Sequence, residues 1–253
     1  MNLIKKISGT LHQLRYNNFI ADKYYAKKRK ELLHREFINS DSYDDLMTKY
    51  DQKGSNYLND AEERNKNFVY RHMKFHKILG GWRWKGLWQK KLTLIPFIFN
   101  KNLKGIDFGG ANGPISLNVI IVDFADKDSF NRAVKYKNLK EVDFEADFIF
   151  SSHTLEHIKE LDSIFAQMKN VLKKGAPLFF LVPAYTCKRW NSGVHTNRKF
   201  NDHAWTFYLE KDIPEGDYQN LLAFDTAVAK HFKVENADYV GDNSIFLSAR
   251  NHN

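Results

Sequence analysis

The 253-residue sequence has almost no cysteine and no long apolar run. A single cysteine, Cys187, excludes an intramolecular disulfide bond and predicts a reducing compartment. No uninterrupted stretch of about 18 apolar residues occurs, which excludes a transmembrane helix. The N-terminus also lacks the apolar core and the small-residue cleavage site of a secretory signal. We therefore expect a cytoplasmic protein.

Acidic residues are scarce in the first 100 residues. These contain 20 Lys and Arg against 10 Asp and Glu, a net charge of +10, whereas residues 101–253 contain 19 against 20, a net charge of −1. We therefore expect two domains: a basic helical N-terminal region over 1–100, acting as a lid or interaction region, and a near-neutral domain over 101–253. The basic field suits a phosphorylated or polyanionic partner, and a solvated basic face is the alternative.

The beginning of the chain is rich in helix-forming residues and contains no proline. Apolar side chains recur along it next to basic ones: Leu3, Ile4, Ile7, Leu11 and Leu14, with Lys5, Lys6 and Arg15. Such a basic amphipathic helix would lie on an anionic membrane surface and make the protein peripheral at the inner membrane face. The alternative is that this stripe packs on the protein's own N-terminal region.

A glycine-rich loop follows a short apolar segment near the middle of the chain. Gly105–Phe108 is apolar apart from Asp107, and the loop Gly109–Gly113 follows at once. This order is typical of a buried parallel strand that ends beneath a nucleotide-like ligand. Glycine lets the backbone adopt positive φ and approach a ligand that a Cβ would keep away.

A second patterned block begins at Asp147. The apolar segment Asp147–Phe150 runs into Ser151–His153 and then into the letters T-L-E-H-I. Apolar residues then recur at three- and four-residue steps, which predicts a helix with one buried face: Leu155, Ile158, Leu161, Phe165, Met168 and Leu172. After it, Pro177–Pro183 predicts another buried strand.

Together the two blocks resemble the class I S-adenosylmethionine-dependent methyltransferase superfamily. The loop is similar to its acid-x-Gly-x-Gly-x-Gly motif, with Ala111 at the middle glycine, and L-E-H followed by V-L-K-K-G-A-P resembles its fourth and fifth strands. The resemblance covers roughly Leu103–Ala249. It implies an α/β, Rossmann-like doubly wound, mostly parallel seven-stranded sheet with an antiparallel closing hairpin, behind a helical N-terminal region. The implied cofactor is S-adenosyl-L-methionine (SAM).

The resemblance also implies which residues bind the cofactor. They lie in the glycine loop and at the ends of neighbouring strands: Asp107, Gly109, Gly110, Ala111, Gly113, Asp123, Ser152 and His153. Asp123 ends a second strand over Val119–Asp123 and is expected on the ribose, since a carboxylate accepts two hydrogen bonds side by side. Only sixteen positions separate Asp107 from Asp123, so the intervening helix must be very short or missing. A third strand is expected over Asn138–Phe144.

Histidines near the expected strand ends are the candidate catalytic residues. Methyl transfer to a hydroxyl benefits from a general base, most often histidine near neutral pH. His153 directly follows the fourth strand, and His203 and His195 lie in the long segment Ala184–Phe207. His153 and His157 also have the i, i+4 spacing of a metal-binding pair. A structural pair is the commoner case, so no metal site is expected.

The same long segment supplies the candidate substrate-binding residues. It follows the C-terminal end of a predicted strand, where open α/β sheets bind their ligands, and so long a loop in a compact domain is usually functional. Its aromatic and cationic side chains suit a saccharide or another small-molecule acceptor: Tyr185, Arg189, Trp190, Arg198 and Trp205.

The residues after the fourth strand indicate the kind of acceptor. Ser151–Thr154 lacks the Asp/Asn-Pro-Pro-aromatic motif that grips the exocyclic amine of a nucleic acid base, so we expect an oxygen acceptor and no nucleic acid partner. Small bacterial sugar and surface-polysaccharide O-methyltransferases look similar around L-E-H. That resemblance implies methyl transfer to a carbohydrate, or to a phosphate- or phosphoramidate-type precursor, in capsule biosynthesis. The alternatives are an RNA methyltransferase that uses the basic N-terminal region and a non-catalytic scaffold.

Overall fold

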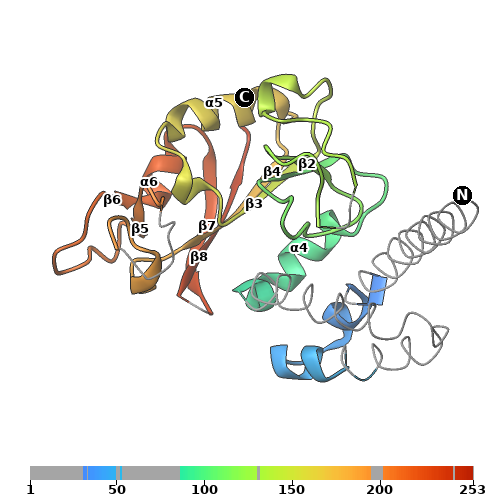
Figure 1. Ribbon diagram of the computed structural model, residues 1–253, viewed down its shortest axis with the longest axis horizontal. Helices are drawn as coiled ribbons and strands as arrows, with labels where there is room; N and C mark the ends of the chain where they lie inside the picture. Colours follow the sequence, from blue (N-terminus) through green and yellow to red (C-terminus); the bar gives the residue numbers. More distant parts are fainter. Residues whose placement is uncertain are drawn as a thin grey trace, which may run out of the picture. The chain divides into compact units, whose positions relative to one another are not determined.

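The computed structural model describes residues 31–32, 34–49, 52, 86–129, 132–194, 202–241 and 243–252, and the chain divides into two units, Met1–Leu79 and Gly80–Asn253 (Figure 1). In the first unit, residues 34–39 and 43–49 are helical. Ser42 begins the second of these helices, because its Oγ accepts a hydrogen bond from Asp45 N at 3.1 Å. The expected amphipathic stripe over residues 3–15 lies outside the described residues. Within the described ranges, no helix is long and apolar enough to cross a membrane.

The second unit is built on a six-stranded sheet with the order β2-β1-β3-β4-β8-β7. Its strands are Gly105–Phe108 (β1), Ile120–Val122 (β2), Phe148–Ser152 (β3), Pro177–Pro183 (β4), Lys233–Val240 (β7) and Ser244–Arg250 (β8). The first four are parallel, whereas β8 pairs antiparallel with both β4 and β7. The expected Rossmann-like sheet with a closing hairpin is therefore confirmed. Because β1 lies between β2 and β3, its C-terminal end is the switch point at which such sheets bind ligands.

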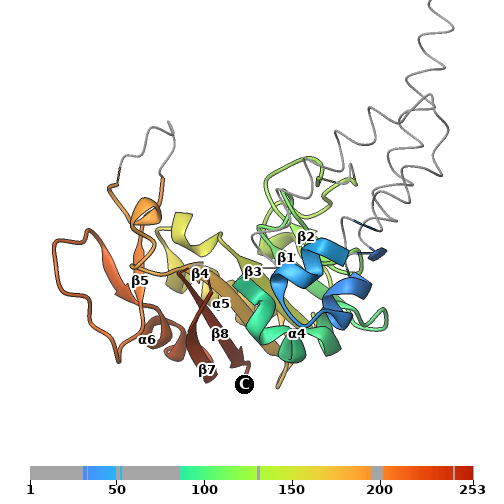
Figure 2. The same ribbon diagram turned by 90° about the horizontal axis from the view of Figure 1, so that it is seen from below.

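Helices cover both faces of this sheet (Figures 1 and 2). Helix α5, Leu161–Val171, packs on one face, and α4, Lys91–Ile98, packs on the other after the short 3-10 helix η2, Trp88–Lys90. Side chains alternate along a strand, so neighbouring residues of β4 face different helices. The Phe180 ring lies 6.0 Å from that of Phe165 in α5, and the Phe179 ring lies 5.2 Å from that of Phe97 in α4.

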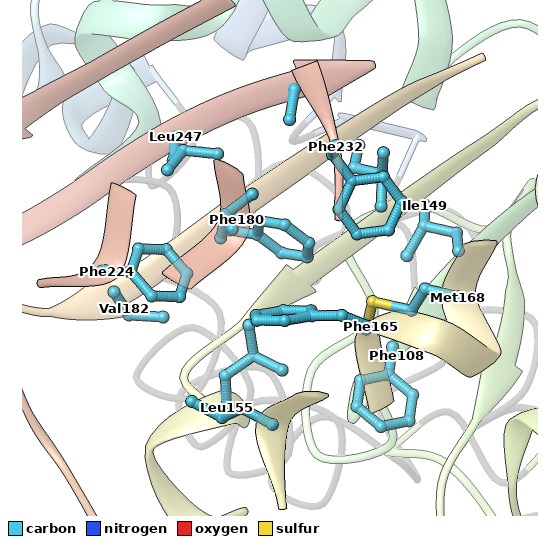
Figure 3. Packing of buried hydrophobic residues seen from close by; sticks show 14 of the residues in the cluster. Phe108, Ile149, Leu155, Phe165, Met168, Phe180, Val182, Phe224, Phe232 and Leu247 are labelled. Atoms are coloured by element: carbon cyan, nitrogen blue, oxygen red, sulfur yellow. The ribbon is translucent and has the colours of Figure 1, made fainter. Parts of the chain in front are cut away.

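The core under α5 combines aromatic and aliphatic side chains (Figure 3). Phe165 and Phe180 are fully buried, and Phe224 meets Phe180 edge-on at 5.9 Å between ring centroids. Phe224 begins α6, Phe224–Ala229, directly after a second, two-stranded parallel sheet made of β5, Thr206–Tyr208, and β6, Leu221–Ala223. This core fixes β3, β4 and the L-E-H segment relative to one another.

The expected third strand over Asn138–Phe144 is not formed. These residues contain the 3-10 helix η3, Leu139–Glu141, instead. The Asn138 side chain caps it by accepting a hydrogen bond from a backbone N–H, and such local bonds compete with strand pairing. A parallel bridge between Val122 and Tyr136 joins the preceding segment to the sheet. The described residues therefore form a six-stranded sheet, and the prediction of seven strands is wrong for them.

The helix expected from residue 155 onward is broken into two parts. The first is the 3-10 turn η4, Leu155–His157, and the second is α5. The Ile158 carbonyl accepts the side-chain N–H of Trp205 at 2.8 Å, and the Glu156 carbonyl accepts Ala204 N at 2.6 Å. Because distant residues take these carbonyls, the turn does not continue into an α-helix. The two histidines expected on one helix therefore do not share one.

The connection from β1 to β2 contains no helix, as the short spacing predicted. Two carboxylates hold this connection in place. Asp107 is fully buried, and its Oδ2 accepts a hydrogen bond from Ile115 N at 2.8 Å. Asp123 Oδ2 accepts one from Ala111 N at 3.0 Å. The loop shape thus depends on side-chain bonds rather than on a helix.

Candidate active site

The glycine loop lies at the end of β1 and packs against the residues that follow β3. Gly109 has a φ of 75°, in the left-handed region that glycine favours, and a Cβ there would lie 2.0 Å from Thr154 Oγ1. A Cβ on Gly110 would lie 2.3 Å from Asp107 Cγ. Both positions therefore require glycine, and the loop backbone lies directly beside Thr154.

Asp123 presents its carboxylate next to the loop. It is half-buried, Oδ2 bonds to Ala111 N, and Oδ1 accepts a hydrogen bond from Ala125 N at 3.0 Å. Each carboxylate oxygen has a further lone pair, so Asp123 can still accept bonds from hydroxyl groups. This is the place expected for the ribose ligand. Asp107 shapes the loop from the inside, and its contact with the cofactor stays a prediction.

Ser152 offers a buried hydroxyl at the end of β3. Its Oγ is buried and has no hydrogen-bond partner among the described residues. The neighbouring Ser151 differs, because its Oγ donates to the Phe108 carbonyl at 3.1 Å. Buried polar atoms in proteins are normally paired, so a ligand group at this end of β3 would satisfy Ser152. The glycine loop, Asp123 and Ser152 thus fit SAM.

A histidine–carboxylate cluster begins immediately after Ser152. His153 has a φ of 51°, which is unusual for a residue with a side chain, and its N–H donates to the Leu181 carbonyl of β4 at 2.8 Å. Its Nδ1 lies 3.5 Å from Glu156 Oε1. Glu156 is almost fully buried, with 1% of its side chain exposed.

His157 and His203 complete the cluster. Their rings meet edge-on with 4.5 Å between centroids. His157 Nδ1 lies 2.7 Å from Asp202 Oδ1, and His203 Nδ1 lies 2.5 Å from the Trp190 carbonyl oxygen. Trp190 belongs to the 3-10 helix η5, Lys188–Trp190, and its ring stacks on His203 at 5.3 Å. The structure therefore brings two distant chain segments into one site.

Burial is the main influence on the charge of His203. Removal from water lowers the pKa of His203, and the nearby Glu156 carboxylate opposes that shift only in part. The neutral imidazole is therefore the form at neutral pH. Because a carbonyl oxygen only accepts hydrogen bonds, His203 Nδ1 carries the proton and Nε2 carries the lone pair.

The remaining residues expected at the site are distributed as follows. Tyr185 is half-buried and packs edge-on against two other tyrosine rings, and Trp205 donates its side-chain N–H to the backbone beyond η4. Arg189 lies in η5. His195 and Arg198 lie outside the described residues. The substrate-binding roles of these side chains stay predictions.

Glu156 is a member of the site that the sequence pattern did not predict. The sequence signal was an acidic residue between the apolar residues Leu155 and Ile158. Helical spacing treats position 156 as exposed, because Leu155 and Ile158 define the apolar face. The carboxylate is buried only because the segment folds as a 3-10 turn and residues 202–205 close over it.

A known protein family matches the part of the chain that forms this site. The family model described as "Methyltransferase domain" matches residues 82–214, which is more than half of the chain. No curated protein matches this chain. Solved structures that are similar include an S-adenosylmethionine-dependent methyltransferase from Clostridium acetobutylicum, with 13% identity, a TM-score of 0.44 and coverage of 63% of this chain and 89% of that chain. Another, from Methanosarcina mazei, has 15% identity, a TM-score of 0.43 and coverage of 63% and 97%.

The chain belongs to the methyltransferase domain family of class I SAM-dependent methyltransferases. The family's cofactor is SAM, and the glycine loop with Asp123 and Ser152 is where this chain's own residues fit it.

Proposed function

We propose that this methyltransferase methylates an oxygen of a carbohydrate, or of a phosphate- or phosphoramidate-type precursor, used in a cell-surface polysaccharide. The observation that supports this is the histidine–carboxylate cluster beside the glycine loop, since a hydroxyl acceptor must lose its proton. SAM supplies an electrophilic methyl group, whose C–S bond breaks as the new C–O bond forms. The protein must place the acceptor oxygen in line and accept its proton.

His153 is the residue to which we assign the general base. It lies next in the chain to Thr154, which occupies the space beside Gly109 in the loop. When His153 takes the acceptor's proton, the carboxylate of Glu156 at 3.5 Å stabilises the resulting positive charge. The lowered pKa of buried His203 makes it a weaker base, which favours His153 of the two.

Residues around the cluster support a saccharide acceptor. Trp190 is half-buried and borders the cluster through its stacked His203 ring. Small-molecule sites are lined by aromatic side chains with a few polar groups that fix orientation, and Trp190 with the cluster matches that composition. The sequence resemblance to sugar O-methyltransferases points the same way.

The test is methyl transfer from labelled SAM by the full-length chain to nucleotide sugars, phosphorylated sugars and RNA. His153→Ala should lower turnover about 10²- to 10⁴-fold with little change in SAM affinity. His231→Ala is the matched control, because its imidazole pairs with Asp162 at 2.8 Å outside the cluster. Methylated RNA or an N-methylated product would contradict the proposed acceptor. Full turnover of His153→Ala would remove the base assignment.

A further inference from the structure

Three side chains of the cluster have the arrangement of metal ligands. Glu156, His157 and His203 each offer one ligand atom, and these atoms all lie within 4.8 Å of one another. Spacing along the chain does not predict this grouping, because His203 lies 46 positions beyond His157. Two imidazoles and one carboxylate are a donor set used by catalytic zinc sites.

The carboxylate of Glu156 points to a missing positive partner. Its Oε2 is buried and has no hydrogen-bond partner among the described residues. The side chain near the other oxygen is His153, whose Nδ1 lies 3.5 Å from Oε1. A buried carboxylate oxygen is costly unless it is paired or coordinates a metal. A cation between Oε2 and the two imidazoles would supply what the fold leaves unsatisfied.

Both imidazoles are oriented as metal ligands usually are. In metal sites, the ring nitrogen that does not bind the ion donates to a carboxylate or to a backbone carbonyl. His157 Nδ1 faces Asp202 Oδ1 at 2.7 Å, and His203 Nδ1 faces the Trp190 carbonyl at 2.5 Å. Because Nδ1 carries the proton in each of these hydrogen bonds, the lone pair of each ring is on Nε2. The Asp202 carboxylate and the Trp190 carbonyl are therefore the same two kinds of acceptor that orient histidine ligands in metal sites.

Backbone bonds hold the two halves of this cluster together. The Glu156 carbonyl accepts Ala204 N at 2.6 Å, and the Ile158 carbonyl accepts the Trp205 side-chain N–H at 2.8 Å. These bonds join η4 and the residue after it to the two residues that follow His203. The ligand positions are thus fixed by the fold, which lowers the entropy lost when an ion binds.

We propose that Glu156, His157 and His203 bind one divalent first-row transition metal ion, through a carboxylate oxygen and two imidazole Nε2 atoms. The two nitrogen ligands favour ions such as Zn²⁺ and Co²⁺ over Mg²⁺ and Ca²⁺, which prefer oxygen ligands. Three protein ligands leave open coordination positions. On the proposed function, on which this role rests, an acceptor oxygen takes one of them, and its proton then passes to His153 more readily.

Metal binding can be measured without any acceptor. Full-length chain freed of metal by a chelator is titrated with Zn²⁺ by calorimetry, and with Co²⁺ by its visible absorption. One ion per chain should bind, and Mg²⁺ should bind at least tenfold more weakly. Glu156→Gln and His203→Gln should each weaken Zn²⁺ binding at least tenfold. No binding to the unsubstituted chain, or unchanged affinity in both variants, would overturn the site.

Two further variants separate metal binding from folding. His157→Gln changes a side chain that is 38% exposed, so the fold should tolerate it, and Zn²⁺ binding should weaken tenfold here too. His231→Gln removes another histidine–aspartate pair outside the cluster and should leave Zn²⁺ affinity unchanged. SAM affinity verifies the fold of each variant. If His231→Gln weakens binding as much as His157→Gln does, the ion is not bound by the cluster.

The outcomes also distinguish this site from the proposed function. Stoichiometric Zn²⁺ binding that Glu156→Gln abolishes, without methylation of any saccharide, supports the metal site and contradicts the acceptor. Saccharide methylation that chelator treatment leaves unchanged, by a chain that binds no Zn²⁺, supports the acceptor and contradicts the metal site.

Discussion

Gly110 has no room for a side chain, because Asp107 occupies the space that a Cβ would take. Gly110→Ala should therefore lower the free energy of unfolding by about 1–3 kcal/mol, the usual cost of overpacking. It should also weaken SAM binding, because the loop must move. Gly175→Ala is the control: Gly175 has a φ of 75° but no atom within 4 Å of the added Cβ.

Gly175→Ala should cost about 1–2 kcal/mol through backbone strain alone and leave SAM affinity unchanged. Chemical denaturation and calorimetric SAM titration of both variants measure these effects. Equal SAM affinity in Gly110→Ala and the unsubstituted protein would mean that the loop does not contact the cofactor.

Asp123 is the single carboxylate to which we assign the ribose. Asp123→Ala should weaken SAM binding by about 1.5–3 kcal/mol, the range for hydrogen bonds to a charged group. Asp126→Ala, three residues on, removes an exposed partner of Lys137 and should leave the SAM dissociation constant unchanged. Calorimetry on both variants decides the assignment, which fails if Asp123→Ala binds SAM as tightly as the control.

At the scale of elements, Asp147 joins the beginnings of β1 and β3. Its Oδ2 accepts Lys104 N at 2.7 Å, and its Oδ1 pairs with Lys173 Nζ at 2.7 Å. The Lys173 ammonium and the Lys104 amide lower the pKa of Asp147, so the stabilisation is present above the unfolded value and is lost as pH falls through the folded value.

Asp147→Asn should therefore lower the free energy of unfolding by about 1 kcal/mol at pH 7, since the ion pair is partly exposed. The difference from the unsubstituted protein should shrink as the pH falls below about 4, the ordinary aspartate value. Denaturation curves between pH 7 and pH 3 measure it. A difference that is the same at every pH would show that the charge of Asp147 contributes nothing.

Some helices and strands of this fold could be predicted from the sequence, and others could not. The strands β1, β4 and β8 are buried, mostly apolar segments bounded by turns, so the hydrophobic pattern was sufficient to predict them. The prediction of a third strand was wrong because the Asn138 side chain caps a 3-10 helix there. The helix after β3 was broken by bonds from Ala204 and Trp205, which lie more than forty residues away along the chain. Such non-local bonds leave no periodic signal.

The residues of the candidate site also differ in whether the sequence could predict them. The positions of the glycine loop and of Asp123 were predictable because both depend on short spacing within one strand–loop unit, and their contacts with SAM stay predictions. His153 and His203 were each expected near the site, but Glu156 was not. Its significance depends on burial under residues 202–205, which is a property of the folded chain.

At the scale of the whole molecule, charge separates the two parts of the chain. The first 100 residues carry a net charge of +10, and the rest carry −1. The residues to which we assign SAM binding all lie in the unit Gly80–Asn253. Deleting the first 30 residues should therefore leave SAM affinity intact and change acceptor affinity or recovery with membranes. Calorimetry, acceptor kinetics and membrane fractionation measure the three quantities, and a truncated protein unchanged in all of them would show that the basic segment is only a solvated face.

We expect cofactor and acceptor to meet where β1 and β3 end. A crystal structure of the full chain with S-adenosylhomocysteine tests it most directly. We expect the ribose hydroxyls to lie within hydrogen-bond distance of the Asp123 carboxylate, the backbone of Gly109–Gly113 to contact the ligand, and the sulfur to face the side of the site that holds His153. A ligand bound away from the glycine loop, or with its sulfur directed away from His153, would contradict the claim.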